Sequence, residues 1–383
     1  MIAHPDPARS GGACRLPYSG RRPYRGHRRP STSPLTWLLA LTVVTSACCA
    51  AEPVALSGRA MGTTWSVKFF QPAPSSPALD PTLVTARVTA TLEHLESVFS
   101  TYRSASELSR FNTATSTDWC PVSPELAQVA WESRRISETT SGAFDATVDP
   151  LVSLWGFGPQ RRITLVPTAS EINAARAFVG YQRLEVRPSP PALRKSIPEL
   201  SADFSSLAKG FATDALSELL TALGAPDHLA QIGGDLKTSG ARPWRTAIEQ
   251  PPSPDLAGHT AALAPALARI ISLSGRALST SGNARNFTTI AGHRYGHIID
   301  PRTGHPIANA LASVSVIHEA CATSSALATA LCVLGPDAGW ALAIREHLAC
   351  LFILREGSVL THRATPEFAR IATTPHTVER TPP

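Results

Sequence analysis

The sequence lacks the short motifs that identify several common enzyme classes. Its 383 residues contain no GxSxG, HExxH or GxGxxG pattern and no GxxxxGK[ST] phosphate loop. The chain therefore carries none of the usual sequence signals of serine hydrolases, zinc metalloproteases, dinucleotide-binding folds or P-loop enzymes. With two methionines and no CxxCH pattern, it also has no signal for a covalently attached haem.

Cysteine is scarce, and its spacing excludes the familiar zinc motifs. No CxxC pair occurs, so the sequence offers no cysteine-rich metal site. If the protein is exported, one disulfide is compatible with the sequence, but its pairing stays open. The seven cysteines are Cys14, Cys48, Cys49, Cys120, Cys321, Cys332 and Cys350.

Most of the chain carries no net charge. Residues 1–47 hold seven arginines against one acid, which equals the formal net charge of +6 of the whole chain. The remaining residues are therefore neutral as a group. A neutral body does not favour a nucleic-acid-binding face, so no nucleic-acid partner is expected.

The N-terminal segment has the pattern of an export signal. The apolar run 35–45 follows the basic stretch and is too short to span a membrane. Small residues and two cysteines come next, which resembles a bacterial lipoprotein cleavage site with Cys48 as the lipidated residue. Lipidation at Cys49, or ordinary cleavage near Ala50 and Ala51, are the alternatives. We expect an export signal over 1–50 and a periplasmic, membrane-anchored protein.

Apolar periodicity predicts an α+β fold. Helices and strands alternate irregularly, without a βαβ repeat, which favours α+β over a doubly wound sheet. The helices are predicted over 83–99, 124–139, 206–223, 321–333 and 338–347. The strands are predicted over 57–70, 228–232, 245–249, 270–273, 287–290 and 312–317.

Residues 297–304 (HIIDPRTG) are the most informative segment of the chain. Two β-branched apolar residues connect His297 to Asp300, and a Pro-Arg-Thr-Gly turn follows. A short strand that ends in such a turn places two proton-handling groups at a strand end, where sites are often built. The segment alone is equally compatible with an edge strand and a polar turn.

The segment 141–150 (SGAFDATVDP) joins a predicted helix to a loop. Phe144 can stack on a flat ligand, and Asp145 can accept a hydrogen bond from a ring N–H. An ordinary helix C-cap with Gly142 in the left-handed conformation is the alternative, and is the better explanation of this segment alone.

The segment 203–212 (DFSSLAKGFA) enters a strong amphipathic helix. Hydroxyls and N–H groups at a helix start, with Lys209 one turn later, can hold a phosphate or its metal. An Asp or Ser N-cap explains the segment equally well. Two weaker signals are the paired glycines before Asp235, which permit close approach of a ligand, and the polar turn 278–283.

Taken in order, eight segments resemble the ApbE family of FAD:protein FMN transferases. None is specific alone, but eight in a fixed order are, and together they cover about residues 57–355. The resemblance implies mixed, T-fold-like sheets with packed helices in one large catalytic unit of two lobes over 51–363, before a loose tail over 364–383. The segments are Met61-Gly62-Thr63, Ser100 to Arg103, Glu107 to Asn112, Gly142 to Asp145, Asp203 to Gly210, Gly233-Gly234-Asp235, Thr280-Ser281-Gly282 and His297 to Gly304.

The resemblance also implies a reaction and its participants. Members of this family transfer FMN from FAD to a Thr or Ser hydroxyl of an acceptor flavoprotein and release AMP. Attack of a hydroxyl at phosphorus needs a base and charge neutralisation, which Mg²⁺ would assist. His297 matches a histidine implicated in catalysis; the sequence does not choose between His297 and Asp300 as the base. The implied flavin contacts are Met61, Tyr102, Ala143, Phe144, Asp145, Asp203, Lys209 and Ile299.

The implied metal site differs from the family pattern. Ser206, Ser325 and Thr329 occupy the expected metal positions, but the family usually has Asp where this chain has Ser325. A neutral hydroxyl is a much weaker ligand for Mg²⁺ than a carboxylate. The alternatives to a transferase are therefore an exported FAD-binding protein or FAD pyrophosphatase with little transferase activity, and a structural lobe with a vestigial site.

Overall fold

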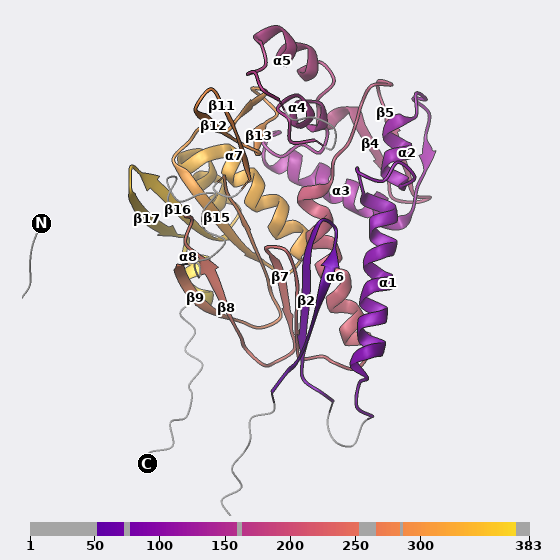
Figure 1. The fold of residues 1–383 in the computed structure, drawn as a ribbon, viewed down its shortest axis with the longest axis vertical. Helices are drawn as coiled ribbons and strands as arrows, with labels where there is room; N and C mark the ends of the chain where they lie inside the picture. Colours follow the sequence, from indigo (N-terminus) through magenta and orange to yellow (C-terminus); the bar gives the residue numbers. More distant parts are fainter. Residues whose placement is uncertain (1–51, 73–76, 159–162, 253–265, 284–285, 373–383) are drawn as a thin grey trace, which may run out of the picture. The chain divides into compact units, whose positions relative to one another are not determined.

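The computed structural model describes residues 52–72, 77–158, 163–252, 266–283 and 286–372 (Figure 1). All of them belong to one compact unit. The expected export signal, including Cys48, and the end of the predicted tail, residues 373–383, lie outside the described residues.

An eight-stranded sheet forms the centre of this unit, and each neighbouring pair of its strands is antiparallel. Because antiparallel neighbours need no crossover helix, this sheet agrees with the predicted α+β class. In spatial order the strands are β1 (Val54–Ala60), β2 (Thr63–Phe69), β6 (His228–Ile232), β7 (Asp235–Ser239), β10 (Ala277–Ser281), β15 (Leu311–His318), β16 (Ala349–Glu356) and β17 (Val359–Ala364).

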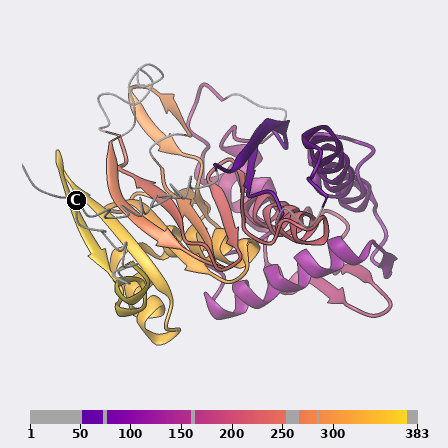
Figure 2. The same ribbon diagram turned by 90° about the horizontal axis from the view of Figure 1, so that it is seen from below.

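The long helices pack together on one side of the sheet (Figure 2). They bury the largest apolar cluster, in which Leu92 of the first helix, Leu216 and Leu331 are almost inaccessible to solvent. Asp80 and Ser123 cap two of these helices with hydrogen bonds to backbone N–H groups, as preferred at helix starts. The helices are α1 (Pro81–Phe99), α3 (Pro124–Thr139), α6 (Ser205–Ala222) and α7 (Cys321–Arg345).

A second apolar cluster covers the opposite face of the sheet. The hairpin of β8 (Trp244–Glu249) and β9 (Leu267–Leu273) contributes to it. The short helix α8 (Pro366–Ala372) adds Phe368, which is fully buried. The segment 366–372 is therefore anchored, contrary to the expected loose tail. Because the two apolar clusters cover both faces of the sheet, nearly all residues of β15 are buried.

A third, smaller cluster lies at one end of the unit, at the top of Figure 1. Leu151, Trp155, Ile172 and Ile299 form its buried core. Its elements are α4 (Asp149–Leu154), α5 (Ala169–Arg176), β11 (Phe287–Ile290), β12 (His293–Gly296), β13 (Ile299–Asp300) and β14 (His305–Pro306). The remaining elements are α2 (Glu107–Thr113), β3 (Cys120–Pro121), β4 (Leu184–Arg187), β5 (Ala192–Lys195) and a 3₁₀ turn (Tyr181–Arg183).

Two sequence predictions differ from the structure, and a third agrees with it. The strand predicted over 57–70 is part of the β1–β2 hairpin, because Met61 and Gly62 both have positive φ and form a two-residue turn. The polar turn predicted over 278–283 is mostly strand β10, whose hydroxyls are satisfied by neighbouring elements. The two helices predicted over 321–333 and 338–347 are both present: α7 consists of two helices that meet at a kink, where Gly335 has a non-helical conformation and Pro336 follows.

Helix α7 is long and apolar enough to cross a membrane by length and composition. Its packing explains this apolar composition without a membrane, since most of its residues up to Val333 are buried against α6 and the sheet. It is therefore the central core helix of this unit.

Candidate functional site

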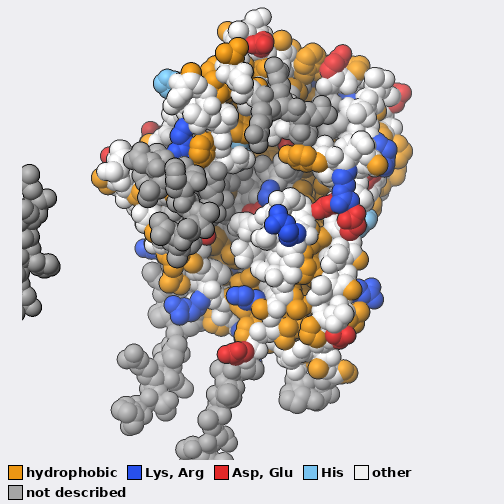
Figure 3. Space-filling model, in the orientation of Figure 1, with side chains coloured by type: hydrophobic (Ala, Val, Ile, Leu, Met, Phe, Trp, Pro, Cys, Tyr) orange, Lys and Arg blue, Asp and Glu red, His pale blue; other side chains and the backbone are white. Residues whose placement is uncertain are grey.

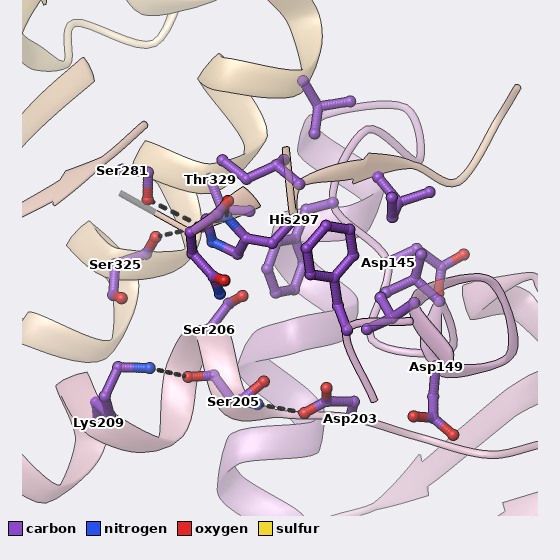
Figure 4. Close-up of a pocket in the computed structure, with 18 of the residues that line it drawn as sticks. Asp145, Asp149, Asp203, Ser205, Ser206, Lys209, Ser281, His297, Ser325 and Thr329 are labelled. Atoms are coloured by element: carbon purple, nitrogen blue, oxygen red, sulfur yellow. Dashed lines mark hydrogen bonds between the residues drawn. The ribbon is translucent and has the colours of Figure 1, made fainter. Parts of the chain in front are cut away.

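A cavity of about 470 Å³ brings together residues from most of the segments identified in the sequence (Figure 4). It lies where α6 begins, beside α7, and is also lined by residues of α4 and of the segment around β13. Among the described residues, the lining includes Ser206, Lys209, His297, Ser325 and Thr329. Charged side chains on the face in Figure 3 are of both signs and interspersed.

One side of the cavity is a group of hydroxyl side chains, which we call the hydroxyl cluster: Ser206, Ser281, Ser325 and Thr329. Ser281 Oγ and Thr329 Oγ1 lie 3.1 Å apart, so β10 and α7 meet there. Ser325 lies one turn before Thr329 on α7 and donates to Asp235 Oδ2 at 3.2 Å. The predicted metal residues are thus brought together, although they come from separate parts of the chain.

The close crossing of α6 and α7 fixes the position of the hydroxyl cluster. A Cβ atom on Gly210 would lie 2.5 Å from the carbonyl oxygen of Cys321, so only glycine allows this approach. Asp214 of α6 also accepts hydrogen bonds from the backbone N–H groups of Cys321 and Ala322 at 2.9 and 3.0 Å. It therefore caps α7 from the neighbouring helix and is held by Lys237 at 2.7 Å.

The start of α6 presents positive charge to the cavity. The N-cap is Phe204, with no side-chain cap of its own, and Asp203 accepts from the N–H of Ser205 at 2.8 Å. Lys209 Nζ donates to the carbonyl of Ser205 at 2.8 Å, which leaves two of its three protons for a ligand. The helix dipole and the lysine together suit an anion such as a phosphate.

His297 lies on the loop before β13 and is half-buried. Its Nδ1 lies 3.0 Å from the carbonyl oxygen of Asn286, which can only accept, so Nδ1 carries the proton. The neutral ring therefore keeps a lone pair on Nε2. Burial lowers the pKa of His297 below its ordinary value, which favours the neutral form. This geometry suits a general base.

Asp300, the alternative base, has a different environment. Its carboxylate accepts from Arg302 Nε at 2.9 Å and Nη2 at 2.8 Å, and from the Arg302 backbone N–H. It does not belong to the residues that line the cavity, whereas its neighbours Ile299 and Pro301 do. In this structure Asp300 organises the turn after β13.

Most of the predicted flavin contacts line the cavity. Ala143, Phe144 and Ile299 are buried among its lining residues, and Tyr102 is largely exposed. Met61 does not line the cavity; it occupies the β1–β2 turn, and its N–H donates to Glu96.

The carboxylate of Asp145 accepts hydrogen bonds from neighbouring protein groups. Its oxygens accept from the N–H and hydroxyl of Thr147 and from the N–H of Tyr181, at 2.7 to 2.8 Å. Desolvation raises the pKa of Asp145. These bonds hold the 143–148 loop in shape, so the carboxylate positions the loop that carries Phe144.

Two further acids line the same side of the cavity. Desolvation raises the pKa of Asp149, whose carboxylate accepts from the Ser201 hydroxyl at 2.9 Å, and the charge of nearby Asp203 adds to this increase. In Figure 4 both acids lie away from the hydroxyl cluster. The cavity therefore has an acidic side and a hydroxyl-rich side.

Among the acids that line the cavity, sequence reasoning assigned no role to Asp149 and Asp235. Asp235 is the first residue of β7 and 5% exposed, and desolvation raises its pKa. The glycine pair before it was a usable signal, because a tight turn at a strand end brings the next side chain to the edge of the sheet. No comparable pattern marks Asp149.

The residues of the hydroxyl cluster fit a hard divalent cation by donor type. Side-chain oxygens are the ligands that Mg²⁺ prefers, and Mg²⁺ sites commonly combine one or two carboxylates with substrate phosphates. The cavity offers several hydroxyls and the Asp235 carboxylate on the side of Lys209. Within the described part of the chain, no group of three or more His, Cys, Asp or Glu side chains could form an all-protein metal cage.

Known proteins resemble this chain along most of its length. The sequence profile of the ApbE family matches residues 61–352. The FAD:protein FMN transferase of Vibrio cholerae is 39% identical over 340 residues, which cover 87% of this chain and 97% of that protein. The corresponding protein of Escherichia coli K12 is 34% identical, covering 83% of this chain and 89% of its own length.

Solved structures agree with this similarity. The flavin transferase ApbE of Vibrio cholerae superposes with a TM-score of 0.75 and 38% identity, covering 84% of this chain and 99% of that one. The apo flavinyl transferase ApbE of Pseudomonas stutzeri gives a TM-score of 0.74 and 37% identity, covering 84% and 97%. The mixed α+β fold predicted from the sequence is therefore confirmed, and the chain belongs to the ApbE family.

Proposed function

We propose that this protein transfers FMN from FAD to a Thr or Ser hydroxyl of an acceptor flavoprotein and releases AMP. The names of its relatives support the reaction class. The observation that carries the proposal is the shared cavity of His297, Lys209 and the hydroxyl cluster. A base, a cation and oxygen ligands for a metal are the groups that phosphoryl transfer requires.

The residues suggest how the transfer proceeds. The acceptor hydroxyl gives its proton to Nε2 of His297, and its oxygen attacks the phosphorus of the FMN half. A new O–P bond forms as the pyrophosphate O–P bond breaks, and AMP leaves with the bridging oxygen. Lys209 and the start of α6 stabilise the negative charge on the phosphoryl oxygens.

We further propose that Mg²⁺ binds at the hydroxyl cluster, near Ser325 and Thr329. When bound, it neutralises charge on the phosphates of FAD. The aromatic and apolar side chains of Phe144 and Ile299 also line the cavity and suit the isoalloxazine ring.

The test is a transfer assay with FAD, Mg²⁺ and a purified acceptor protein that carries the target threonine. We expect equal amounts of AMP and of covalent, fluorescent flavin on the acceptor. A matched acceptor with Ala at that threonine should stay unlabelled. AMP release without labelling would identify a FAD pyrophosphatase, and FAD binding without AMP would identify a flavin-binding protein.

The absence of a carboxylate at Ser325 favours these alternatives as second candidates, because a hydroxyl binds Mg²⁺ weakly. A titration of acceptor labelling with Mg²⁺ separates them from the transferase. A rate that rises with Mg²⁺ and then saturates supports metal-assisted transfer. A rate that changes neither when Mg²⁺ is added nor when a chelator removes it contradicts the proposed role of the metal.

We also propose that the protein is an extracytoplasmic lipoprotein attached through Cys48. This rests on the sequence pattern, since residues 1–51 lie outside the described structure. Labelling with a palmitate analogue should modify the wild-type protein and spare Cys48→Ala. Label retained in that variant but lost in Cys49→Ala would move the anchor by one residue, and no label in the wild type would indicate ordinary cleavage.

A further inference from the structure

A buried carboxylate, Asp235, is in contact with Ser325 of the hydroxyl cluster. It follows the Gly233-Gly234 turn, lines the cavity and is only 5% exposed. Its Oδ2 lies 3.2 Å from Ser325 Oγ, so the two side chains meet although they are 90 residues apart in sequence.

Asp235 has no ion-pair partner among the described residues. The nearest candidates are engaged elsewhere: Lys237, two residues along the strand, binds Asp214 at 2.7 Å, and Lys209 donates to the Ser205 carbonyl. A buried carboxylate without a cation is costly, and proteins usually pair such a group or use it to bind a metal. Lys209 is near enough for its charge to act on Asp235, but the groups that contact the carboxylate are the hydroxyls of Ser279 and Ser325.

The neighbours of Asp235 complete a set of oxygen ligands. Ser325, Thr329 and Ser281 line the same cavity, with 3.1 Å between the last two hydroxyls. One carboxylate, a few neutral oxygens and the phosphates of a substrate make up a common Mg²⁺ site. The hydroxyls alone lack the negative charge that such a site needs.

We propose that Asp235 supplies the anionic ligand of the divalent cation in this chain, in place of a carboxylate at position 325. This rests on the proposed function, because the phosphates of FAD complete the ligand shell. The distance between the two positions explains why only one of them carries an acid. A carboxylate at 325 would lie within about 3 Å of Asp235, where two like charges repel each other. One acid with one hydroxyl avoids that repulsion.

Binding of Mn²⁺, a paramagnetic substitute for Mg²⁺, tests the proposal without turnover. The purified protein is titrated with Mn²⁺ and followed by electron paramagnetic resonance, with and without FAD. We expect Asp235→Asn to weaken Mn²⁺ binding at least about 10-fold, the lower range for losses at metal sites. Asn keeps the shape of Asp and an oxygen that can still accept from Ser325.

The decisive variant carries both Asp235→Asn and Ser325→Asp. This variant again has one carboxylate at the two positions, now at 325 instead of 235, so its Mn²⁺ affinity should return to within a few-fold of the wild type. The control Asp149→Asn removes an acid from the other side of the cavity and should leave Mn²⁺ affinity unchanged. If Asp235→Asn does not fold, Ser325→Asp alone serves: its thermal stability should fall without metal and recover with Mn²⁺.

Several outcomes would overturn the proposal: unchanged Mn²⁺ affinity in Asp235→Asn, no recovery in the double variant, or no Mn²⁺ binding by the wild type even with FAD. These results are independent of FMN transfer, which the acceptor assay measures separately. A wild type that binds Mn²⁺ through Asp235 but labels no acceptor would leave this inference intact and contradict the proposed function.

Discussion

Two walls of the cavity are built in different ways. The helical wall consists of Ser206 and Lys209 on α6 with Ser325 and Thr329 on α7, and these helices pack in the largest apolar cluster. The hairpin wall is the segment His297–Pro301, carried by two-residue strands over the small cluster around Trp155. The comparison indicates that the proposed phosphate and metal ligands belong to a rigid frame, and the proposed base to a lightly supported loop.

The hairpin wall depends on a few specific contacts instead of extensive packing. The Asn286 carbonyl accepts from both the backbone N–H and Nδ1 of His297, at 3.1 and 3.0 Å. Trp155 Nε1 donates to the carbonyl of Gly304 at 2.9 Å and ties the following turn to α4. Such a loop can adjust to an acceptor protein, whereas the helical wall cannot move without disturbing the core.

The largest effect is expected from removing the base on the hairpin wall. His297→Asn should lower kcat of FMN transfer by roughly 10²–10⁴-fold, the usual contribution of a general base. FAD affinity, measured by flavin fluorescence, should change little. The control His293→Asn alters an exposed histidine on β12 and should transfer normally. Full activity of His297→Asn would contradict the proposal that the hairpin wall supplies the base.

On the helical wall, Lys209→Met should lower kcat by roughly 10²–10³-fold, since one donor to the developing charge is lost. Release of AMP in single-turnover experiments measures this step. Lys68→Met, at an exposed position of β2, is the matched control. An effect confined to KM would show that Lys209 binds FAD without stabilising the transition state.

Rigidity of the helical wall can be tested at the α6–α7 crossing. Gly210→Val forces a side chain against the backbone of Cys321 and should cost about 1–3 kcal/mol of unfolding free energy, with weaker metal binding. Chemical denaturation measures the loss. Ala222→Val adds the same β-branched side chain at an exposed position of α6 and should cost much less. Equal losses would argue against a fixed crossing.

Support of the hairpin wall can be tested at Trp155. Trp155→Phe leaves the Gly304 carbonyl without its donor, which costs about 1–3 kcal/mol for a buried group. Hydrogen exchange should accelerate in 297–306 and stay unchanged in α6 and α7. Uniform acceleration throughout the unit would mean that the two walls open together.

The smallest effect concerns pH. Burial lowers the pKa of His297 below the ordinary value of 6.5, and in the proposed mechanism the neutral ring acts as the base. The acid limb of kcat/KM, which reports the free enzyme, should therefore lie below pH 6.5, and activity should rise with pH through it. His297→Asn should lose this limb. A limb above 6.5 would contradict the burial of His297 in the free protein.

The sequence predicted much of the site but not its geometry. His297, Lys209 and Phe144 were identified from local patterns, and all three line the cavity. Asp300 belonged to the same local pattern as His297. In the structure it binds Arg302 and does not line the cavity, and the sequence alone does not show that orientation. Met61 was expected at the flavin, but a two-residue turn holds it outside the cavity.

The sequence by itself determined the α+β class, the long helices and the order of motifs that places the chain in its family, because these depend on local periodicity and chemistry. Only the tertiary structure decided which side chains meet. Ser281, Ser325 and Asp235 come together because β7, β10 and α7 converge, and the α6–α7 crossing at Gly210 fixes their spacing. Contacts between such distant residues depend on packing, which no local pattern records.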